Sequence, residues 1–347
     1  MPRTRVAIVG LGMAVGPHAK SLVDLKDKAE VAWAMSPTAA RRDAFAKNFP
    51  FPTTGDLDQV IGDKSVDALL VLTPPNTHLE IVRKAAAAGK HVLLEKPLDV
   101  NTERATAIVQ ACDKAGVKLG AVLQHRFRPA SLRVKQVLDE GGLGRLAHVS
   151  VSVPWWRPQK GYYDQPGRGT LARDGGGVLI TQAIHTLDLL LHLAGPIASV
   201  SAFAGTSPVH QMETEDQVVA ALRYANGALG ALDCTTAAYP GYPETILLAG
   251  EKGSARIQAT EAVIEYAAHD GKPASREVVG ALGSGGGGAD PMAFPHDWHR
   301  GVIEDFIDAV RDDRPPAIPG HEELRVHHMI DALLRSARER RTISPAT

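Results

Sequence analysis

The residues best suited to bind a charged ligand form a glycine-rich turn near the N-terminus. Gly10 and Gly12 follow a strand-like run at residues 6–9, and a helical pattern begins near Met13. Glycines at such a junction let the backbone approach a pyrophosphate, whose charge is stabilised by the helix N-terminus. The third glycine of the usual pattern is displaced, because Val15 takes its place. The turn therefore predicts a dinucleotide site that includes Met13, with a ligand-free glycine turn as the alternative.

The end of the second strand-like run indicates which dinucleotide would bind. An acid that binds the ribose hydroxyls of NAD is expected about 20 residues after the glycine turn. Ser36 and Thr38 stand there instead, followed by Arg41. Hydroxyl and guanidinium donors favour a 2′-phosphate through charge-assisted hydrogen bonds. We therefore expect NADP as the preferred cofactor, with NAD as the alternative if Arg41 and Arg42 only form the solvated face of a helix.

A lysine is placed where it could act on a substrate. Lys96 stands between Glu95 and Pro97, directly after a strand-like run at residues 91–94. Parallel α/β sheets bind their ligands at this carboxyl edge. Pro97 favours an extended conformation for Lys96 and prevents a helix from starting there. An ammonium at this place could orient a substrate hydroxyl or lower its pKa, and the alternative is an ordinary surface lysine in a loop.

The elements that must position these residues alternate short apolar strands with helices over the first 125 residues. Continuous apolar strands between helical segments indicate a parallel sheet covered on both faces. Gly89 and Gly116 stand where helix C-termini favour a left-handed residue. The pattern predicts a doubly wound α/β domain over residues 1–125, with strands at 6–9, 31–35, 68–72, 91–94 and 119–123.

After about residue 128 the rhythm changes, which predicts a second domain over residues 126–347. A helix is expected at 179–193, and strand-like runs follow it between residues 199 and 267. Asn226 and Gly227 separate two of these runs and give the strongest short hairpin signal. We expect an α+β domain with an antiparallel or mixed sheet and helices on one face. A flexible glycine-rich loop at 284–288 and a helix capped by Asp297 follow it.

Composition limits the class of protein. The chain has 347 residues, 44% of them hydrophobic and 22% charged, with a formal net charge of -1. This balance gives no reason to expect nucleic acid or an anionic membrane as a partner. The longest apolar runs also read as too short to span a bilayer. Two isolated cysteines, Cys112 and Cys234, and the lack of a signal-peptide pattern predict a cytoplasmic protein.

Several motifs follow one another along nearly the whole chain. They are Gly10-Leu11-Gly12 with His18, Thr73-Pro74-Pro75-Asn76-Thr77-His78, Glu95-Lys96-Pro97, and Gly175-Gly176-Gly177 followed by His185 and Asp188. In order and spacing these segments resemble the Gfo/Idh/MocA oxidoreductase family, and the Glu-Lys-Pro motif is the most specific of them. The resemblance implies an N-terminal Rossmann domain and a C-terminal domain with an open, mostly antiparallel sheet. It also implies oxidation or reduction of sugars, cyclitols or related polyols with NAD or NADP.

The resemblance also implies roles for single residues. Lys96 is the catalytic lysine by this resemblance, and His185 is the residue that transfers the hydroxyl proton. Histidine titrates near neutral pH and an ammonium stabilises a developing alkoxide, so both roles fit alcohol oxidation. A lone histidine on a helix would otherwise be a structural residue. The residues that the resemblance places along the cofactor near the nicotinamide are Thr73, Pro74, Asn76 and His78, with Glu95 beside them.

One departure from the family concerns the residue four positions before His185. The family commonly carries an aspartate there, one helical turn away, but this chain has Thr181. A threonine can orient a substrate hydroxyl but carries no charge at neutral pH. Proton transfer would therefore depend on His185 and Lys96.

Aromatic and basic residues before the triple glycine are candidates for substrate binding. Trp155 and Trp156 could cover the apolar face of a sugar ring, and Arg157 could bind hydroxyls, a carboxylate or a phosphate. Equally, the two tryptophans could pack an interface between domains or subunits. His125 and Arg126 follow the last parallel strand, where we expect them to touch substrate or cofactor.

The sequence thus predicts an NADP- or NAD-dependent dehydrogenase or reductase of a small sugar or polyol. His296 and His299 lack a third ligand at metal spacing, so we expect no metal site. The resemblance implies a homodimer or homotetramer that associates through the second-domain sheet. Two alternatives stay open: a catalytically silent nucleotide-responsive regulator on the same fold, and an oxidoreductase of a non-sugar such as a diol.

Overall fold

The computed structural model describes residues 3–269, 271–283 and 295–346, which form two compact units. The first unit comprises Met1–Gln124 and Pro295–Leu324, and the second His125–Phe294 and Arg325–Thr347. We expected a contiguous second domain over residues 126–347, whereas residues 295–324 cluster with the first unit. The expected glycine-rich loop at 284–288 lies outside the described residues.

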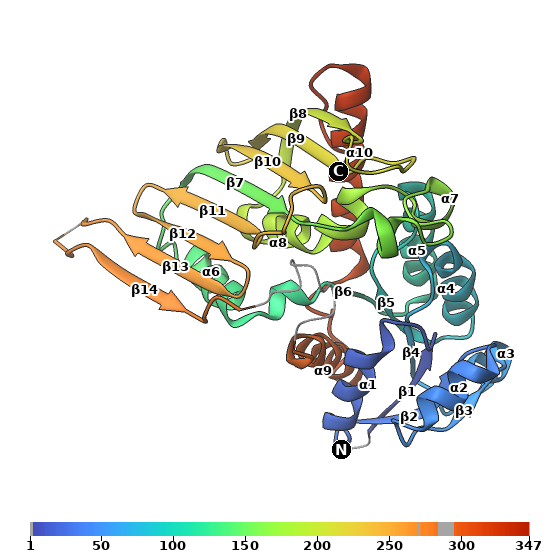
Figure 1. Ribbon diagram of the computed structural model, residues 1–347. Coiled ribbons are helices and arrows are strands. Elements are labelled where there is room, and N and C mark those ends of the chain that lie inside the picture. The colour runs from blue at the N-terminus through green and yellow to red at the C-terminus, as the bar shows by residue number, and fades with distance from the viewer. Residues whose placement is uncertain (1–2, 270, 284–294, 347) are drawn as a thin grey trace. The chain divides into compact units, whose positions relative to one another are not determined.

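The first unit is built on a sheet in the order β3-β2-β1-β4-β5-β6, in which every pair is parallel (Figure 1). Its strands are β1 (Thr4–Val9), β2 (Ala29–Met35), β3 (Thr53–Thr54), β4 (Ala68–Val71), β5 (His91–Glu95) and β6 (Leu119–Val122). The expected doubly wound sheet is confirmed, and only the short β3 was not expected. The strand order reverses between β1 and β4, so their carboxyl ends form the switch point where such sheets bind ligands.

Helices cover this sheet, and one of them comes from far downstream in the sequence. They are α1 (Val15–Asp24), α2 (Ala39–Ala46), α3 (Leu57–Gly62), η1 (Pro75–Thr77), α4 (His78–Ala87), α5 (Thr102–Ala115) and α9 (Asp297–Arg311). α9 packs against α1 and against β1, β5 and β6. Gly120 on β6 makes room for it, because an added Cβ would lie 2.8 Å from the Phe306 ring. The expectation that Asp297 caps this helix is wrong: His296 is the N-cap, without a side-chain hydrogen bond, and Asp297 is the first helical residue.

The second unit contains a sheet in the order β14-β13-β12-β11-β7-β10-β9-β8. Its strands are β7 (Leu146–Pro154), β8 (Ile197–Gly205), β9 (Gln217–Tyr224), β10 (Leu229–Thr235), β11 (Thr245–Gly250), β12 (Gly253–Gln258), β13 (Glu261–Tyr266) and β14 (Ser275–Val279). Only β7 and β10 pair in parallel, so the expected mostly antiparallel sheet is confirmed. The expected hairpin joins β9 and β10 through Asn226 and Gly227, and Gly227 has φ +90.

One face of this sheet is covered by helices, as α6 packs on β12, β13 and β14 and α8 on β7 and β11 (Figure 1). Besides α9, the helical segments after β6 are η2 (Gln124–Phe127), α6 (Pro129–Asp139), η3 (Gln159–Tyr163), α7 (Leu171–Asp174), η4 (Leu179–Ala183), α8 (Ile184–Ala194) and α10 (Gly320–Glu339). Ten of the eleven residues of α8 are buried, because leucines occur on every side of it. A helix that is apolar all round belongs in a core.

One helical stretch of the described chain, Leu171–Ala194, is long and apolar enough to cross a membrane by length and composition alone. The expectation that the apolar runs are too short concerned consecutive apolar residues, and polar and charged residues interrupt this stretch. In addition, 89% of its most apolar window is buried inside the protein. Such burial is typical of the core helix of a globular protein.

Candidate cofactor and catalytic site

The glycine turn at the carboxyl end of β1 fits the close approach of a dinucleotide. Gly10 has φ +109, and an added Cβ would lie 2.8 Å from the backbone carbon of Leu72, so a side chain would be strained and crowded there. The Gly10 amide donates to the Met35 carbonyl at 2.9 Å. By contrast, an added Cβ at Gly12 would meet nothing within 4 Å. The outer side of the turn is therefore open to a ligand.

The N-terminus of α1 leaves backbone amides for that ligand. Its N-cap, Ala14, makes no side-chain cap hydrogen bond, and the first turn holds no acidic residue. Unsatisfied amides and the helix dipole favour an anion at such a terminus. Val15, which replaces the third glycine, is only half-buried as the first helical residue, and Met13 is exposed. These residues fit a pyrophosphate.

The loop after β2 presents hydroxyl and guanidinium groups. The buried Ser36 hydroxyl accepts from the Thr38 amide at 3.3 Å, and Arg42 Nη1 donates to the Ser36 carbonyl at 2.6 Å. Arg42 therefore holds the loop. Thr38, the N-cap of α2, and Arg41 are both exposed. They are the side chains of this loop that can reach a ligand.

The loop after β4 is tied to the Glu-Lys-Pro segment by His78. The His78 ring is buried, with Nδ1 3.1 Å and 3.0 Å from the carbonyls of Pro97 and Leu98 and Nε2 2.8 Å from that of Thr73. Burial lowers the pKa of His78, while the facing carbonyls oppose this shift. Both ring nitrogens therefore face main-chain carbonyls, and His78 would support a cofactor through the position of Thr73. The residues that remain accessible are Thr73, which is half-buried, and Pro74 and Asn76, which are exposed.

A buried pair of histidines lies behind Glu95. His18 Nε2, on α1, is 3.1 Å from the Glu95 carboxylate, and the His18 ring meets the His299 ring edge-on at 4.9 Å. Both imidazoles are buried. Burial lowers the pKa of His299 well below its usual value, and the charges of His18, His296 and Lys96 act in the same direction. These contacts fix the end of β5, which carries Lys96.

The contribution of His299 was not expected from the sequence. We had considered His299 only as a possible metal ligand, a role that the lack of a third ligand at metal spacing argues against. The signal that could have found it is helical spacing, because His299 precedes the buried Phe306 by two turns and lies on the same apolar face of α9.

In the second unit, a chain of buried polar groups holds His185. Its ring stacks on His125 with centroids 4.9 Å apart. His125 Nε2 lies 2.6 Å from Arg128 Nη2, and Arg128 donates to Glu244 at 2.8 Å. Because a guanidinium can only donate, His125 accepts through Nε2 and carries its proton on Nδ1. His185 thus stacks on a neutral imidazole.

Arg126 and Thr181 make hydrogen bonds inside the same unit. Arg126 donates through Nε at 2.8 Å and through Nη2 at 2.5 Å to the two carboxylate oxygens of Asp188, and both side chains are buried. Asp188 is one turn beyond His185 on α8, so this ion pair also fixes the helix. The Thr181 hydroxyl donates to the Gly177 carbonyl at 2.7 Å.

The triple glycine allows a carboxylate to cap the helix that carries His185. Glu215 accepts from the amide of Gly177 at 3.2 Å and from that of Leu179 at 3.4 Å. An added Cβ at Gly177 would lie 1.8 Å from the Glu215 carbonyl oxygen, which no side chain tolerates. The Glu215 carboxylate stabilises the positive end of the helix. Its own pKa is raised by burial.

The aromatic residues after β7 divide into a buried and an accessible part. Trp155 is buried, whereas Trp156 is half-buried and meets the exposed Tyr239 edge-on at 5.5 Å. Arg157 is buried and donates to Gln182 Oε1 at 2.9 Å. Trp156 is therefore the better candidate for a sugar face, and Trp155 packs the interior of the unit.

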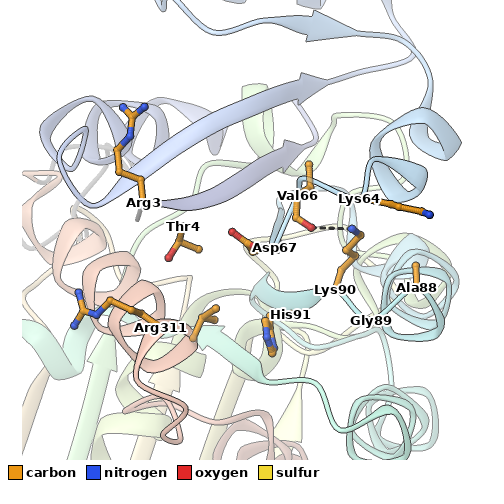
Figure 2. Close-up of a pocket in the computed structure, with 11 residues that line it drawn as sticks. Arg3, Thr4, Lys64, Val66, Asp67, Ala88, Gly89, Lys90, His91 and Arg311 are labelled. Carbon is orange, nitrogen blue, oxygen red and sulfur yellow. Dashed lines mark hydrogen bonds between the residues drawn. The ribbon is translucent and has the colours of Figure 1, made fainter. Parts of the chain in front are cut away.

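A pocket of about 660 Å³ lies at the opposite, amino edge of the parallel sheet (Figure 2). Three of its cations have partners: Arg3 pairs with Glu30, Arg311 with Asp308, and the Lys90 ammonium donates to the carbonyls of Asp63 and Val66. It lies away from the glycine turn and the Glu-Lys-Pro segment, which are at the carboxyl edge. No cluster of three or more possible metal ligands occurs in the part of the chain that the structure describes.

This chain combines a parallel sheet that carries an open glycine turn with a second, mostly antiparallel sheet. The combination is typical of dinucleotide-binding enzymes. Two family models match: "Oxidoreductase family, NAD-binding Rossmann fold" over residues 4–122 and "GFO/IDH/MocA C-terminal domain" over residues 131–256. The chain belongs to the Gfo/Idh/MocA oxidoreductase family, and the resemblance predicted from its motifs is confirmed.

Individual relatives agree with this family. The chain is 28% identical to the inositol 2-dehydrogenase of Rhizobium meliloti over 356 residues, 99% of each chain. It is 30% identical to the WlbA dehydrogenase of Bordetella pertussis, solved with NADH and UDP-GlcNAcA, with a TM-score of 0.83 and complete coverage of both chains. Levoglucosan dehydrogenase, solved with NADH and levoglucosan, has a TM-score of 0.88 at 20% identity, with 99% and 100% coverage, and shows the fold alone. Relatives named for NAD(+) and for NADP(+) both occur.

We expect His299 to make stability depend on pH. Its pKa is well below 6.5 in the folded state and about 6.5 in the unfolded chain. Below that pH the unfolded chain binds a proton that the folded protein excludes. The free energy of unfolding should therefore fall with decreasing pH from about 6.5, by up to ~1.4 kcal/mol per pH unit. Urea unfolding of the wild type and of His299→Leu at several pH values measures this slope.

The dependence of the free energy of unfolding on pH should be weaker in His299→Leu than in the wild type. We expect the remaining dependence to come from His78, whose pKa is also lowered by burial. His148→Leu is the matched control, because His148 is exposed on β7. Equal slopes in the wild type and His299→Leu would contradict the prediction.

Proposed function

We propose that this chain is an NAD(P)-dependent oxidoreductase that transfers hydride between nicotinamide and a secondary alcohol or carbonyl of a sugar, cyclitol or related polyol. One observation carries the proposal. Lys96 stands at the carboxyl edge of the parallel sheet, on a segment that His18 and His78 hold from both sides, and the glycine turn at the same edge is open to a ligand. A lysine on a segment with a fixed backbone position is better suited to catalysis than a lysine on a mobile surface loop.

The residues of this chain divide the chemistry of the hydroxyl group. The nicotinamide cofactor, when bound, accepts the hydride or supplies it. We assign the proton of the hydroxyl to His185, which takes it in the oxidative direction and returns it in the reductive one. Lys96 stabilises the alkoxide that develops as the proton leaves. Thr181 stands where the family resemblance implies an acid, and its hydroxyl donates to the Gly177 carbonyl, so we assign it no proton.

The loop after β2 supports NADP as the preferred cofactor. Thr38 and Arg41 are its accessible polar groups, and no acidic side chain stands between Ser36 and Arg42 to repel a 2′-phosphate. The matching relatives include enzymes of both kinds, so the preference is a property to measure in this chain.

The buried thiols support a cytoplasmic location. Cys112 and Cys234 are both free and buried, and burial raises the pKa of Cys112 to about 12. Thiols that are neither paired nor reactive suit a reducing compartment.

The outer face of the second-unit sheet supports self-association. Phe203 on β8 and Val219 on β9 are cross-strand partners and are 78% and 47% exposed, and Leu229 on β10 is 51% exposed. Their side chains lie on the face of these strands opposite to the buried residues. Large apolar side chains exposed on one face of a sheet favour a second copy of the chain, and we propose a homodimer or homotetramer.

Replacing Lys96 by alanine should abolish turnover while leaving cofactor binding nearly intact. The ammonium acts on the alkoxide, so we expect kcat to fall by about a thousandfold or more, with a cofactor Kd close to that of the wild type. Absorbance assays of the nicotinamide cofactor with a panel of sugars and cyclitols measure kcat, and titration with the cofactor measures its Kd. Lys114→Ala, in the exposed last turn of α5, is the control. Turnover by Lys96→Ala at the wild-type rate would refute the role.

The cofactor preference is tested at Arg41. Wild-type protein should bind NADPH more tightly than NADH by titration calorimetry. Arg41→Ser should weaken NADPH by about tenfold, the value of one charge-assisted hydrogen bond, and change NADH little. Lys47→Ser, at the other end of α2, should change neither. Tighter binding of NADH by the wild type would show that the preference is for NAD.

Self-association is tested by sedimentation velocity at micromolar concentration. We expect a dimer or tetramer for the wild type and a monomer for Phe203→Asp, because the new charge replaces the most exposed of these apolar side chains and cannot be buried against a second copy. Leu282→Asp, which changes another exposed apolar residue outside the sheet strands, should leave the assembly unchanged. A monomeric wild type would disprove association through this face.

A further inference from the structure

The loop between β7 and η4 gathers hydrogen-bond donors around the ring of Tyr162. The guanidinium carbon of Arg168 lies 4.6 Å from the ring centre, and that of Arg157 lies 5.8 Å from it. The Arg157 carbon is also 5.3 Å from the centre of the Trp155 ring. Two positive charges thus share one aromatic platform. Burial lowers the pKa of Arg157, and the neighbouring charge of Arg168 lowers it further.

Two of these donors, on Arg168 and Trp155, have no acceptor among the described residues. Arg157 donates to the uncharged oxygens of Gln182, at 2.9 Å, and of the Trp156 carbonyl, at 2.8 Å. Arg168 Nε is buried and has no hydrogen-bond partner within residues 3–269, 271–283 and 295–346. The indole Nε1 of the buried Trp155 likewise has no hydrogen-bond partner among the described residues. A buried donor without an acceptor is costly unless a ligand supplies one.

The acidic residues of the loop serve other partners. Asp164 accepts from the Gly161 amide at 2.8 Å, and Asp174 accepts from the Gly169 amide at 2.8 Å. Asp174 also pairs with Arg173. These carboxylates therefore shape the loop and do not neutralise Arg168.

The donors lie next to the helix that carries the catalytic candidate of this unit. Gln182 accepts from Arg157 and donates to the Tyr162 hydroxyl at 2.6 Å, so it joins both to η4. Gln182 precedes His185 by three residues, about one helical turn. A group bound at the guanidinium pair is therefore within the reach of one small molecule from His185.

We propose that Arg157, Arg168, Tyr162 and Trp155 bind a negatively charged group of the substrate, so that the enzyme acts on an anionic sugar or polyol. The inference rests on the proposed oxidoreductase function and names its substrate class. Carboxylate and phosphate oxygens accept several hydrogen bonds at once, and guanidinium groups bind them in a bidentate manner. A sugar hydroxyl offers less acceptor capacity and no charge, so it would leave the positive charge of Arg168 without a counter-charge.

Steady-state kinetics with matched substrates test the proposal. D-Glucose, D-glucuronate and D-glucose 6-phosphate share one ring and differ in charge, and galactose with galacturonate form a second set. We expect kcat/KM for at least one anion to exceed that of its neutral counterpart by about tenfold or more. The carboxylate and phosphate arms show which anion the site takes. Equal or better turnover of the neutral sugars in both sets would overturn the inference and leave the proposed function standing.

Arg168→Gln tests the assignment to these residues. It should reduce the ratio of anionic to neutral kcat/KM by about tenfold, mostly through KM, whereas Arg173→Gln in the same loop should change the ratio by less than about twofold. An unchanged ratio in Arg168→Gln would overturn the assignment. Thermal unfolding of each variant shows that the fold is kept.

Direct binding separates failure of this inference from failure of the proposed function. If no sugar is turned over with either cofactor, the proposed function fails. Titration calorimetry with glucuronate, glucose 6-phosphate and glucose, in the presence of NADP, then decides the anion site by itself. Tighter binding of an anion by the wild type than by Arg168→Gln supports the site, and binding that does not distinguish charged from neutral sugars rejects it.

Discussion

The fixed position of the segment after β5 is the constraint on which the candidate site depends. A parallel sheet brings strand ends to one edge, but a strand end is free to move unless something holds it. Here His18 bonds Glu95, His78 faces the carbonyls of Pro97 and Leu98, and Glu323 accepts from the Leu98 amide at 3.0 Å. All three partners are buried, so the segment that carries Lys96 cannot shift without leaving polar groups unsatisfied in the interior.

The second unit uses the same principle with stronger charges. The Arg126–Asp188 and Arg128–Glu244 ion pairs are both buried, and burying such pairs is costly unless their geometry is good. They fix the helix of His185 and the imidazole on which it stacks. Glu215 holds the start of that helix, and Gly177 is the residue that lets it approach. Stability and the placement of His185 therefore depend on the same polar groups.

Much of the fold could be predicted from the sequence because its signals are local. Apolar runs gave the strands of the parallel sheet, Asn226 and Gly227 gave the hairpin, and the motif order gave the family. The short β3 has two residues and no period to detect. The return of α9 to the first unit was not predicted, because helical periodicity shows which face is apolar but not which sheet covers it. Asp297 was taken for a cap because the residue type suits one, yet the helix begins one residue too early for that role.

The sequence by itself determined the glycine turn, the position of Lys96 after a strand, and the position of His185 on an apolar helix. Each of these features follows from residue types at short spacing. Only the tertiary structure decided which groups surround them. His18 and His299 are 281 residues apart and touch through their rings, and Arg128 and Glu244 pair across 116 residues. Contacts at such separations depend on how elements pack, and packing is a property of the whole folded chain. Short spacing in the sequence is therefore enough to pick out the candidate residues, whereas the buried partners of the segment after β5 decide where Lys96 lies.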